Sequence, residues 1–583
     1  MLKKILYIFN RRQKRNTVIL LFLMLIGSVI ELLGVSAIMP LVTVVTDTSV
    51  IKTNPTYAKI GEILGISDAK TYVLTLAGIL ILVYIIKNAY VCVWYNLQYR
   101  FIYNNQRRLS LQLLDYYVHQ DYLYHTSVNV SILQRNIGSD VTFCFDVILN
   151  MLSFANETLV CVVLVTYLAI VDFTSTMAMA VLLLIFLAIF VLFFRKYSVK
   201  LGKKEREAGA VQNKWMLQCF AGIKEIKVMN KEKFFLDNFG YYSQKSVDLR
   251  RKQNFSQMLP KPIMETVCIC GLLVTMSVKI YFGGDMSQFV PILSVFAVAA
   301  FRMLPSINKL SGCVSAIMYG KSALESVYAD VHEMRSNTKK WNEEDNDTYE
   351  FTMNEEIAVK NLSFKYPTGE SNVLTNVSFR IPKLKSTALI GPSGAGKSTM
   401  ADLLLGVMSP NEGTIEVDGV NIADHMKAWH RKIGYIPQVI YLMDDTIRAN
   451  VAFGVSKEKI DDEKVWKALK EAQLDEFVRS NPEGLDAEVG DRGVRISGGQ
   501  RQRIGIARAL YADPDILVLD EATSALDTET ETAVMEAIDA LHGSRTMLII
   551  AHRLSTIRNC DYIYEVKDGS INLKDKSEIN ATK

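Results

Sequence analysis

Apolar residues gather in six long runs within residues 1–320, and polar residues separate these runs. A helix needs about 20 apolar residues to cross the hydrocarbon core of a bilayer, and each run is long enough to do so. The six predicted spans lie at about residues 17–45, 72–95, 147–171, 176–195, 262–283 and 287–311. The pattern therefore predicts an all-α membrane domain over residues 1–325.

Two long polar connections, residues 96–146 and 196–261, are basic and have helical periodicity. We expect them to extend the neighbouring spans as helices. The segment before the first span carries six Lys or Arg residues and no acidic residue. The positive-inside rule therefore places the N-terminus in the cytoplasm, and six spans bring the C-terminal domain to the same side.

Few ionisable residues interrupt the predicted spans. They include Glu31, Lys87, Glu157, Glu265 and Arg302, with Lys261 at a boundary. A charge at this depth is costly and usually faces a partner or a hydrated cavity. The pattern favours structural pairs between helices for Glu31 and Glu157. Arg302 is expected either to pair with Glu265 or to face a hydrated cavity. The side chains of Lys87 and Lys261 are long enough to reach the membrane–water interface.

Beyond a polar linker at residues 326–354, strands alternate with helices, which predicts an α/β domain over residues 355–583. A strand at residues 386–390 is followed by Gly391-Pro-Ser-Gly-Ala-Gly-Lys-Ser-Thr399 and then by a helical run. This is a P-loop, in which backbone N–H groups surround the phosphates of ATP, Lys397 reaches the β- and γ-phosphates, and Ser398 binds Mg²⁺. The predicted loop residues are Gly391, Ser393, Gly394, Ala395, Gly396, Lys397, Ser398 and Thr399.

Two further motifs complete the predicted ATPase site. An apolar strand at residues 516–519 ends in Asp520 and Glu521. We expect Asp520 to hold the Mg²⁺ and Glu521 to orient and deprotonate the attacking water. The sequence Ser497-Gly-Gly-Gln500 opens a helix, and free N–H groups at a helix start favour an anion. It predicts a second phosphate-binding site made by Ser497, Gly498, Gly499 and Gln500.

These motifs and their order along the chain resemble those of the ATP-binding cassette transporters. The resemblance covers the whole chain. Ile496 replaces the leucine that usually precedes the Ser-Gly-Gly-Gln signature. The resemblance implies that Tyr366 stacks on adenine, that Gln438 approaches the metal, and that Asp527 belongs to the D-loop. It also implies that His552 contacts the γ-phosphate.

The same resemblance implies a dimer, in which the signature of one subunit closes on ATP held by the other subunit's P-loop. We expect a homodimer, and a heterodimer stays open. Residues 490–493 resemble the X-loop of exporters. Six spans before one cassette is the order found in exporter half-transporters. Six spans also argue against a soluble cassette ATPase that acts on DNA or ribosomes, and the small net charge of +4 gives no sign of a nucleic-acid partner.

The first and sixth spans resemble those of bacterial flippases of lipid-linked oligosaccharides. In the first span the resemblance lies in Glu31 and residues 36–40, and in the sixth span it lies in residues 301–306. The resemblance implies that a polyprenyl-pyrophosphate-linked glycan is moved to the outer leaflet of the cytoplasmic membrane. Lys87, Lys261 and Arg302 are candidate cations along the path of this anionic glycolipid. Export of other lipids, drugs or peptides is the alternative, and an ATP-gated channel also stays open.

Overall fold

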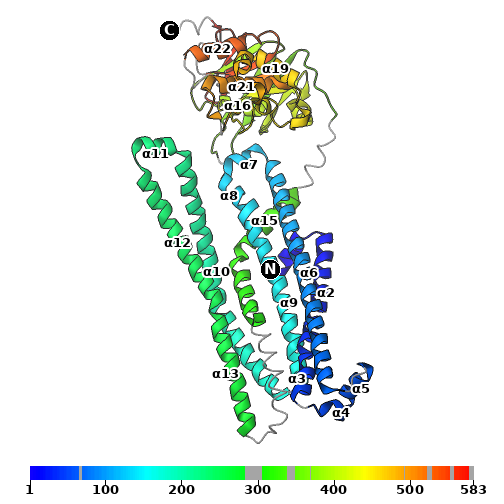
Figure 1. Cartoon of the computed structure of the whole chain (residues 1–583). Coiled ribbons are helices and arrows are strands. Elements are labelled where there is room, and N and C mark those ends of the chain that lie inside the picture. Colours follow the sequence, from blue (N-terminus) through cyan, green and yellow to red (C-terminus); the bar gives the residue numbers. More distant parts are fainter. Residues whose placement is uncertain are drawn as a thin grey trace. The chain divides into compact units, whose positions relative to one another are not determined.

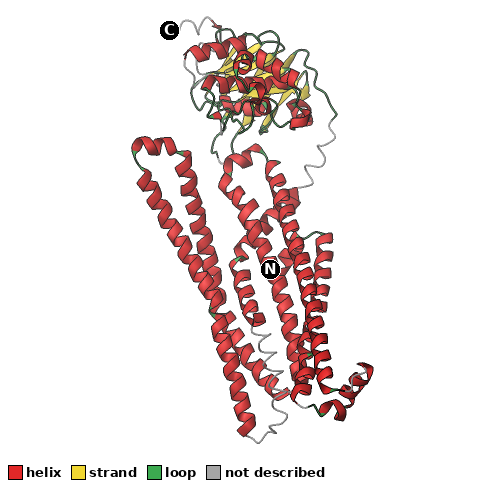
Figure 2. Ribbon diagram, viewed as in Figure 1, coloured by secondary structure: helices red, strands yellow, loops and turns green. Residues whose placement is uncertain are grey.

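The structure is a computed structural model. It describes the chain except for residues 47, 65–67, 172, 282–304, 338–347, 368, 491–492, 521–527, 552–556 and 577–583. The chain divides into two compact units. The first comprises Met1–Gln120 and Val128–Lys339, and the second comprises Asp121–Ser127 and Lys340–Lys583. Figure 2 shows only helices in the first unit, whereas the second combines strands with helices.

The first unit is built on long helices (Figure 1). They are α2 (Arg11–Ser36), α6 (Ala69–Val118), α9 (Val141–Val171), α10 (Phe173–Ala221), α12 (Glu232–Met258), α13 (Pro260–Tyr281) and α15 (Lys321–Asn337). Residues 305–319 are also helical. The shorter elements are α1 (Leu2–Ile8), α3 (Ile38–Thr46), α4 (Val50–Thr53), α5 (Pro55–Leu64), α8 (Val130–Arg135), η1 (Asn136–Asp140) and α11 (Ile223–Met229).

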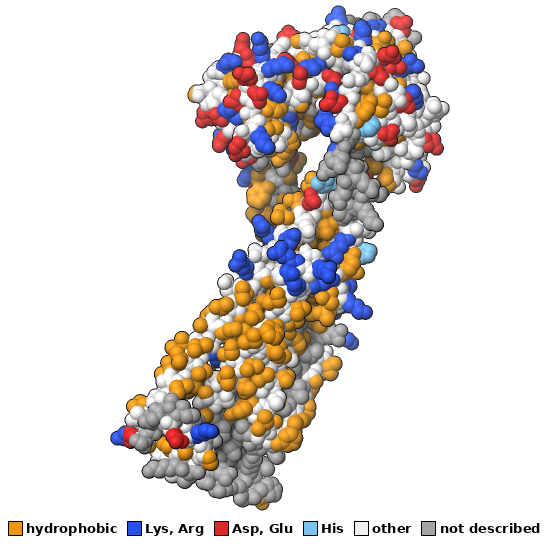
Figure 3. All heavy atoms as spheres, turned by 90° about the vertical axis from the view of Figure 1, so that its right-hand side faces the viewer, with side chains coloured by type: hydrophobic (Ala, Val, Ile, Leu, Met, Phe, Trp, Pro, Cys, Tyr) orange, Lys and Arg blue, Asp and Glu red, His pale blue; other side chains and the backbone are white. Residues whose placement is uncertain are grey.

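Among the described residues, three helical stretches are long and apolar enough to cross a membrane: Arg11–Gly34, Ala69–Val118 and Val130–Ile170. The predicted span 176–195 lies within α10, and most of 262–283 lies within α13. Residues 287–304 of the sixth predicted span lie outside the described part of the chain. Figure 3 shows apolar side chains in a broad band on this unit, with Lys and Arg gathered at one border of the band.

The polar connections extend the spans as expected, since α6 continues to Val118 and α10 to Ala221. The first unit also extends further along the chain than the expected boundary at residue 325. Leu324, Val327 and Val331 of α15 recur at helical spacing and are buried. Residues 326–337, expected as part of a linker, are therefore helical and belong to the first unit.

The second unit contains two sheets. The antiparallel sheet has the order β2-β1-β4-β5, and the larger sheet has the order β10-β9-β3-β8-β7-β6. The strands are β1 (Glu356–Phe364), β2 (Leu374–Pro382), β3 (Ser386–Ile390), β4 (Glu412–Val417), β5 (Val420–Asn421), β6 (Ile433–Ile436), β7 (Ile516–Asp520), β8 (Thr546–Ile550), β9 (Tyr562–Lys567) and β10 (Ser570–Leu573). In the larger sheet, β9, β3, β8, β7 and β6 are parallel, and β10 is antiparallel.

Helices accompany both sheets of this unit. They are α7 (Tyr122–Ser127), α16 (Lys397–Leu404), α17 (Met426–His430), α18 (Ile447–Val451), α19 (Asp462–Glu471), α20 (Asp475–Ser480), α21 (Gly498–Tyr511) and α22 (Thr528–Asp539). Short 3₁₀ turns are η2 (Ile422–His425), η3 (Lys457–Lys459) and η4 (Gly484–Asp486). Although α7 comes from the connection 96–146, it belongs to this unit, and Leu123 packs against the core that contains Phe364 and Met400.

The middle of the larger sheet positions the predicted site. Strands β3, β7 and β8 are buried almost throughout, as is typical of parallel strands covered on both faces. Because β8 pairs in parallel with both β3 and β7, the carboxyl ends of all three strands meet at one edge of the sheet. Ligands of open α/β sheets bind at this edge.

Candidate ATP-binding and hydrolysis site

The P-loop leads from the end of β3 at Ile390 to the start of α16 at Lys397. Its glycines adopt positive φ angles, 147° at Gly391, 80° at Gly394 and 103° at Gly396, which side chains rarely allow. A Cβ atom on Gly391 would lie 2.2 Å from the carbonyl oxygen of Val566. The positive φ angle and the lack of room for a side chain therefore both require glycine at position 391.

We predict that Gly391→Ala destabilises the full chain more than Gly394→Ala. Both substitutions place a side chain at positive φ, which costs about 1–3 kcal/mol. At Gly394 no atom lies within 4 Å of the added Cβ, so only the Gly391 variant must also shift the backbone of β9. Thermal unfolding in detergent without nucleotide compares the two variants. Equal losses would show that the contact with Val566 is unimportant.

The two predicted magnesium ligands lie close together. The hydroxyl oxygen of Ser398 is 3.4 Å from Oδ1 of Asp520, although the residues are 122 positions apart in the chain. Ser398 lies on α16, which follows β3, and Asp520 ends β7; only β8 separates these two strands in the sheet. Magnesium prefers carboxylate, hydroxyl and phosphate oxygens. The pair therefore fits the metal for which the sequence predicted it.

Lys397 is 5% exposed and folds back over the loop. Its Nζ donates to the carbonyl oxygens of Gly391 at 2.9 Å and Pro392 at 3.0 Å. The ammonium group is thereby held above the loop whose N–H groups are predicted to surround the phosphates. Contact of Lys397 with the β- and γ-phosphates stays a prediction, because it requires the ammonium group to exchange these carbonyl oxygens for phosphate oxygens.

Asp402 is a charged residue of this site that the sequence motifs did not single out. It lies one turn after Ser398 on α16. Burial raises the pKa of Asp402 to about 6, and the neighbouring charge of Asp520 adds to the effect. A cation held by Asp520 would offset this repulsion. The only sequence signal for Asp402 was its i,i+4 spacing from Ser398, which puts both residues on one face of the helix.

Tyr366 and Gln438 lie on segments that lead to the same region. The hydroxyl of Tyr366 is 3.1 Å from Oγ1 of Thr399, which places this tyrosine beside the start of α16. Gln438 is exposed and follows β6, the strand next to β7. Stacking of Tyr366 on adenine and approach of Gln438 to the metal stay predictions.

The signature residues form the N-terminus of α21, as expected. Ser497 is the N-cap residue, and its side chain accepts from the N–H of Gln500 at 3.2 Å. The Gln500 side chain accepts from the N–H of Ser497 at 2.9 Å, which completes a capping box. Ser497 and Gly498 are exposed, whereas Gly499 is buried. This helix start is therefore open to an anion that approaches from solvent.

Several predicted residues lie outside the described part of the chain. They are Glu521, Asp527 and His552 of the ATPase site and Arg302 of the sixth span. Their roles stay predictions. Residues 491–492 of the X-loop sequence also belong to this group.

Ion pairs hold two of the carboxylates in the predicted spans. Lys87 donates to Oε1 of Glu31 at 3.0 Å, and Lys309 donates to Oε1 of Glu157, also at 3.0 Å. The structural pairs expected for Glu31 and Glu157 are thus confirmed. Lys309 was not predicted as a partner. Lys261 is exposed on α13, as is Glu265.

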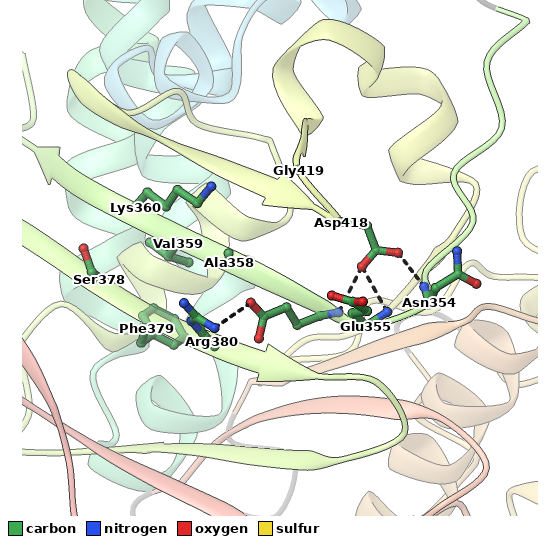
Figure 4. A pocket seen from close by; sticks show the side chains of 11 residues that line it. Asn354, Glu355, Ala358, Val359, Lys360, Ser378, Phe379, Arg380, Asp418 and Gly419 are labelled. Atoms are coloured by element: carbon green, nitrogen blue, oxygen red, sulfur yellow. Dashed lines mark hydrogen bonds and ion pairs between the residues drawn. The ribbon is translucent and has the colours of Figure 1, made fainter.

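A hollow of about 540 Å³ lies over the antiparallel sheet, away from these motifs (Figure 4). Its polar groups bind one another. The Asp418 carboxylate accepts from the N–H groups of Asn354, Glu355 and Glu356 at 2.5–3.0 Å. Arg380 pairs with Glu356 at 3.2 Å. These contacts fix the backbone where the chain enters β1, so we assign them a structural role.

A P-loop at the carboxyl edge of a parallel sheet, a carboxylate beside its serine, and a unit of long apolar helices define a membrane-bound P-loop ATPase. The ABC transporter family matches residues 374–524. The ATP-dependent lipid A-core flippase of Burkholderia thailandensis is 30% identical over 470 residues, which cover 79% of this chain and 77% of that protein. The chain belongs to the ABC transporters, as an exporter half-transporter whose ATPase is coupled to transport.

Two further comparisons agree with this assignment. The ATP-dependent lipid A-core flippase of Pseudomonas aeruginosa is 35% identical over 343 residues, 58% of this chain and 55% of that protein, so this match spans about half the length of the relative. The structure of a bacterial Atm1-family ABC exporter with ATP bound has a TM-score of 0.73 and 23% identity, covering 98% of this chain and 97% of that one. This second likeness shows the fold: a helical transmembrane domain followed by an α/β nucleotide-binding domain.

Proposed function

We propose that this protein uses ATP to flip a polyprenyl-pyrophosphate-linked oligosaccharide across the bacterial cytoplasmic membrane, with its N-terminus and cassette in the cytoplasm. The observation that carries the lipid part of the proposal is the 470-residue match to a lipid A-core flippase. That stretch is longer than the cassette, so it must include part of the membrane unit. The choice of a polyprenyl carrier rests on the motifs of the first and sixth predicted spans.

For hydrolysis, we propose that Ser398 and Asp520 hold Mg²⁺ together with the phosphates of ATP. The metal supplies positive charge that offsets the charge of the transferred phosphoryl group. Lys397 leaves its two carbonyl acceptors to contact the phosphates. Glu521 accepts the proton of the attacking water, and His552 contacts the γ-phosphate. Each of these roles is placed on the residue that the sequence motif indicates.

We also propose that two chains form a homodimer with two composite ATP sites. Ser497 is exposed at the start of α21, and the N–H groups there favour an anion. The nucleotide that it contacts would be held by the P-loop of the other subunit. Asp527 would lie at the same dimer contact.

Mixed dimers test this arrangement. A Lys397→Ala chain paired with a Ser497→Arg chain contains one doubly damaged site and one intact site if the signature acts on the partner's ATP. We expect such isolated mixed dimers to keep about half of the wild-type ATPase activity, because each site is assembled independently. Both mutant homodimers should be inactive. Mixed dimers as inactive as the homodimers would contradict the composite site.

The cations proposed to guide the pyrophosphate head are Lys87, Lys261 and Arg302. Lys261 is exposed, so its ammonium group is accessible. Lys87 is held by Glu31, so it contributes only where the head group displaces this carboxylate, and Lys261 and Arg302 are the main cations of the proposal. An arginine offers two parallel hydrogen bonds to a phosphate, whereas each lysine acts as a point charge.

The proposed substrate is tested by the ATPase activity of the purified protein in liposomes. The panel contains a polyprenyl-pyrophosphate-linked glycan, lipid A-core, a hydrophobic drug and a peptide. We expect the polyprenyl-linked glycan to stimulate hydrolysis most. Stronger stimulation by lipid A-core would make this protein a flippase for the substrate named for its relatives. Stimulation only by the drug or the peptide would reject glycolipid flipping.

A further inference from the structure

A cavity of about 230 Å³ lies inside the helical unit, between α2, α6 and α9. Polar side chains from all three helices line it: Glu31 from α2, Lys87, Asn88 and Trp94 from α6, and Asn156 and Glu157 from α9. All of them lie within predicted membrane spans. Polar side chains at this depth are costly unless they pair with one another or face a polar occupant.

The charges at this cavity are compensated by the protein itself. Lys87 pairs with Glu31, and Lys309 pairs with Glu157, with N···O distances of 3.0 Å in both cases. Each carboxylate among the described lining residues therefore has its own ammonium partner. A charged ligand would have to disrupt one of these pairs, which is costly where the pair is buried. The cavity is thus suited to a neutral ligand.

Two residues that line the cavity each have a buried polar atom with no hydrogen-bond partner within the described part of the chain. These atoms are Nε1 of Trp94, which can only donate, and Oε2 of Glu157, which accepts. Trp94 is 6% exposed and Glu157 is 4% exposed. A buried polar atom without a partner costs free energy, so an occupant that satisfies both is favoured. A ligand with several hydroxyl groups suits this pair, because each hydroxyl can either donate or accept.

We propose that this cavity binds one sugar ring of the transported glycolipid, an inference that rests on the proposed function. A sugar hydroxyl donates to Oε2 of Glu157, and a sugar oxygen accepts from Nε1 of Trp94. The amides of Asn88 and Asn156 offer further donors and acceptors. The volume is below the roughly 300–1,000 Å³ of pockets for drug-sized ligands, so it suits one ring and not a whole oligosaccharide.

A row of tyrosines on α6 leads from this cavity toward the predicted cytoplasmic connection. Tyr95 lines the cavity, and Tyr99 and Tyr103 follow at intervals of four residues. Neighbouring rings in the row have centroids 6.2 Å apart and are nearly parallel, at 21° and 23°. Tyr99 is 44% exposed and Tyr103 is 57% exposed. Their flat apolar faces offer packing area to the C–H groups of a sugar on its way to the cavity.

The test measures binding of two labelled probes to the full chain in lipid nanodiscs. One probe is a polyprenyl pyrophosphate that carries a single N-acetylhexosamine, and the other is the same lipid without the sugar. Trp94→Phe removes the indole N–H but keeps an aromatic ring. Trp215→Phe is the matched control, because Trp215 packs on Phe234 and Phe235 and does not line the cavity. Asn156→Ala provides a second cavity variant if the Trp94 variant folds poorly.

We expect wild-type protein to bind the sugar-bearing probe more tightly than the sugar-free probe. Trp94→Phe and Asn156→Ala should each weaken binding of the sugar-bearing probe about 5-fold, the usual effect of one hydrogen bond, and leave the sugar-free probe unchanged. Trp215→Phe should change neither. Equal binding of the two probes, or equal losses for both in the cavity variants, overturns the sugar site and leaves the proposed function standing. Failure of both probes to bind rejects the two together.

Discussion

Glu521→Gln is expected to slow ATP hydrolysis by about 10²-fold or more while ATP binding is kept, the usual scale for loss of a general base. Glu521 directly follows Asp520, whose Oδ1 lies 3.4 Å from the hydroxyl oxygen of Ser398. The sequence motif predicts that the side chain at the next position reaches a water opposite the γ-phosphate. Glutamine keeps the size of the side chain but cannot accept the proton.

The measurement combines steady-state ATP turnover with nucleotide affinity, both on the full chain. Glu536→Gln is the matched control, since Glu536 is exposed on α22 and the substitution removes the same charge. We expect this control to hydrolyse ATP normally. Near-normal turnover of the Glu521 variant, or a loss of ATP binding as large as the loss of turnover, would remove Glu521 from the role of base.

Lys87→Met is expected to lower the free energy of unfolding by about 3–5 kcal/mol, the scale for removing one partner of a buried ion pair. The side chains of Lys87 and Glu31 are only 11% and 6% exposed, and they are 3.0 Å apart. Methionine has a similar length and shape, so the main change is that the Glu31 carboxylate loses its ammonium partner. Unfolding of the full chain by denaturant in detergent measures the loss.

Two comparisons isolate the role of the pair. Adding Glu31→Gln to Lys87→Met should recover most of the lost stability, because no buried charge remains. Lys321→Met is the surface control, since Lys321 and Glu325 are 3.8 Å apart and 43% and 47% exposed. Exposed pairs contribute only about 0–1 kcal/mol. A Lys87 variant no less stable than the Lys321 variant, or a double variant as unstable as the single one, contradicts the account of Glu31.

The sequence predicted the P-loop and the closeness of Ser398 and Asp520 because short motifs with fixed spacing determine them. A strand, a glycine loop and a helix in succession place Lys397 and Ser398 at the edge of a sheet. The strand that ends at Asp520 then needs only to be parallel to β3, and the structure places the two oxygens 3.4 Å apart. Neither step depends on the details of side-chain packing.

Features that depend on packing between distant helices were not predictable in the same way. Glu157 was expected to form a structural pair, but its partner Lys309 is 152 residues away and depends on how the helix of residues 305–319 packs on α9. The cavity beside this pair was not foreseen for the same reason. Nor did helical periodicity show that α7 belongs to the second unit, because periodicity does not identify the surface on which a helix packs.

Movement of the lipid itself tests the central claim most directly. Purified protein is reconstituted into liposomes with a fluorescent polyprenyl-pyrophosphate-linked glycan, and a membrane-impermeant quencher reports how much of it lies in the outer leaflet. Cassettes that face outward are the ones that added ATP reaches, so ATP should move the lipid away from the quencher. We expect this movement with wild-type protein and not with Glu521→Gln. ATP hydrolysis at the normal rate without any change in the accessible lipid would contradict flipping of this substrate.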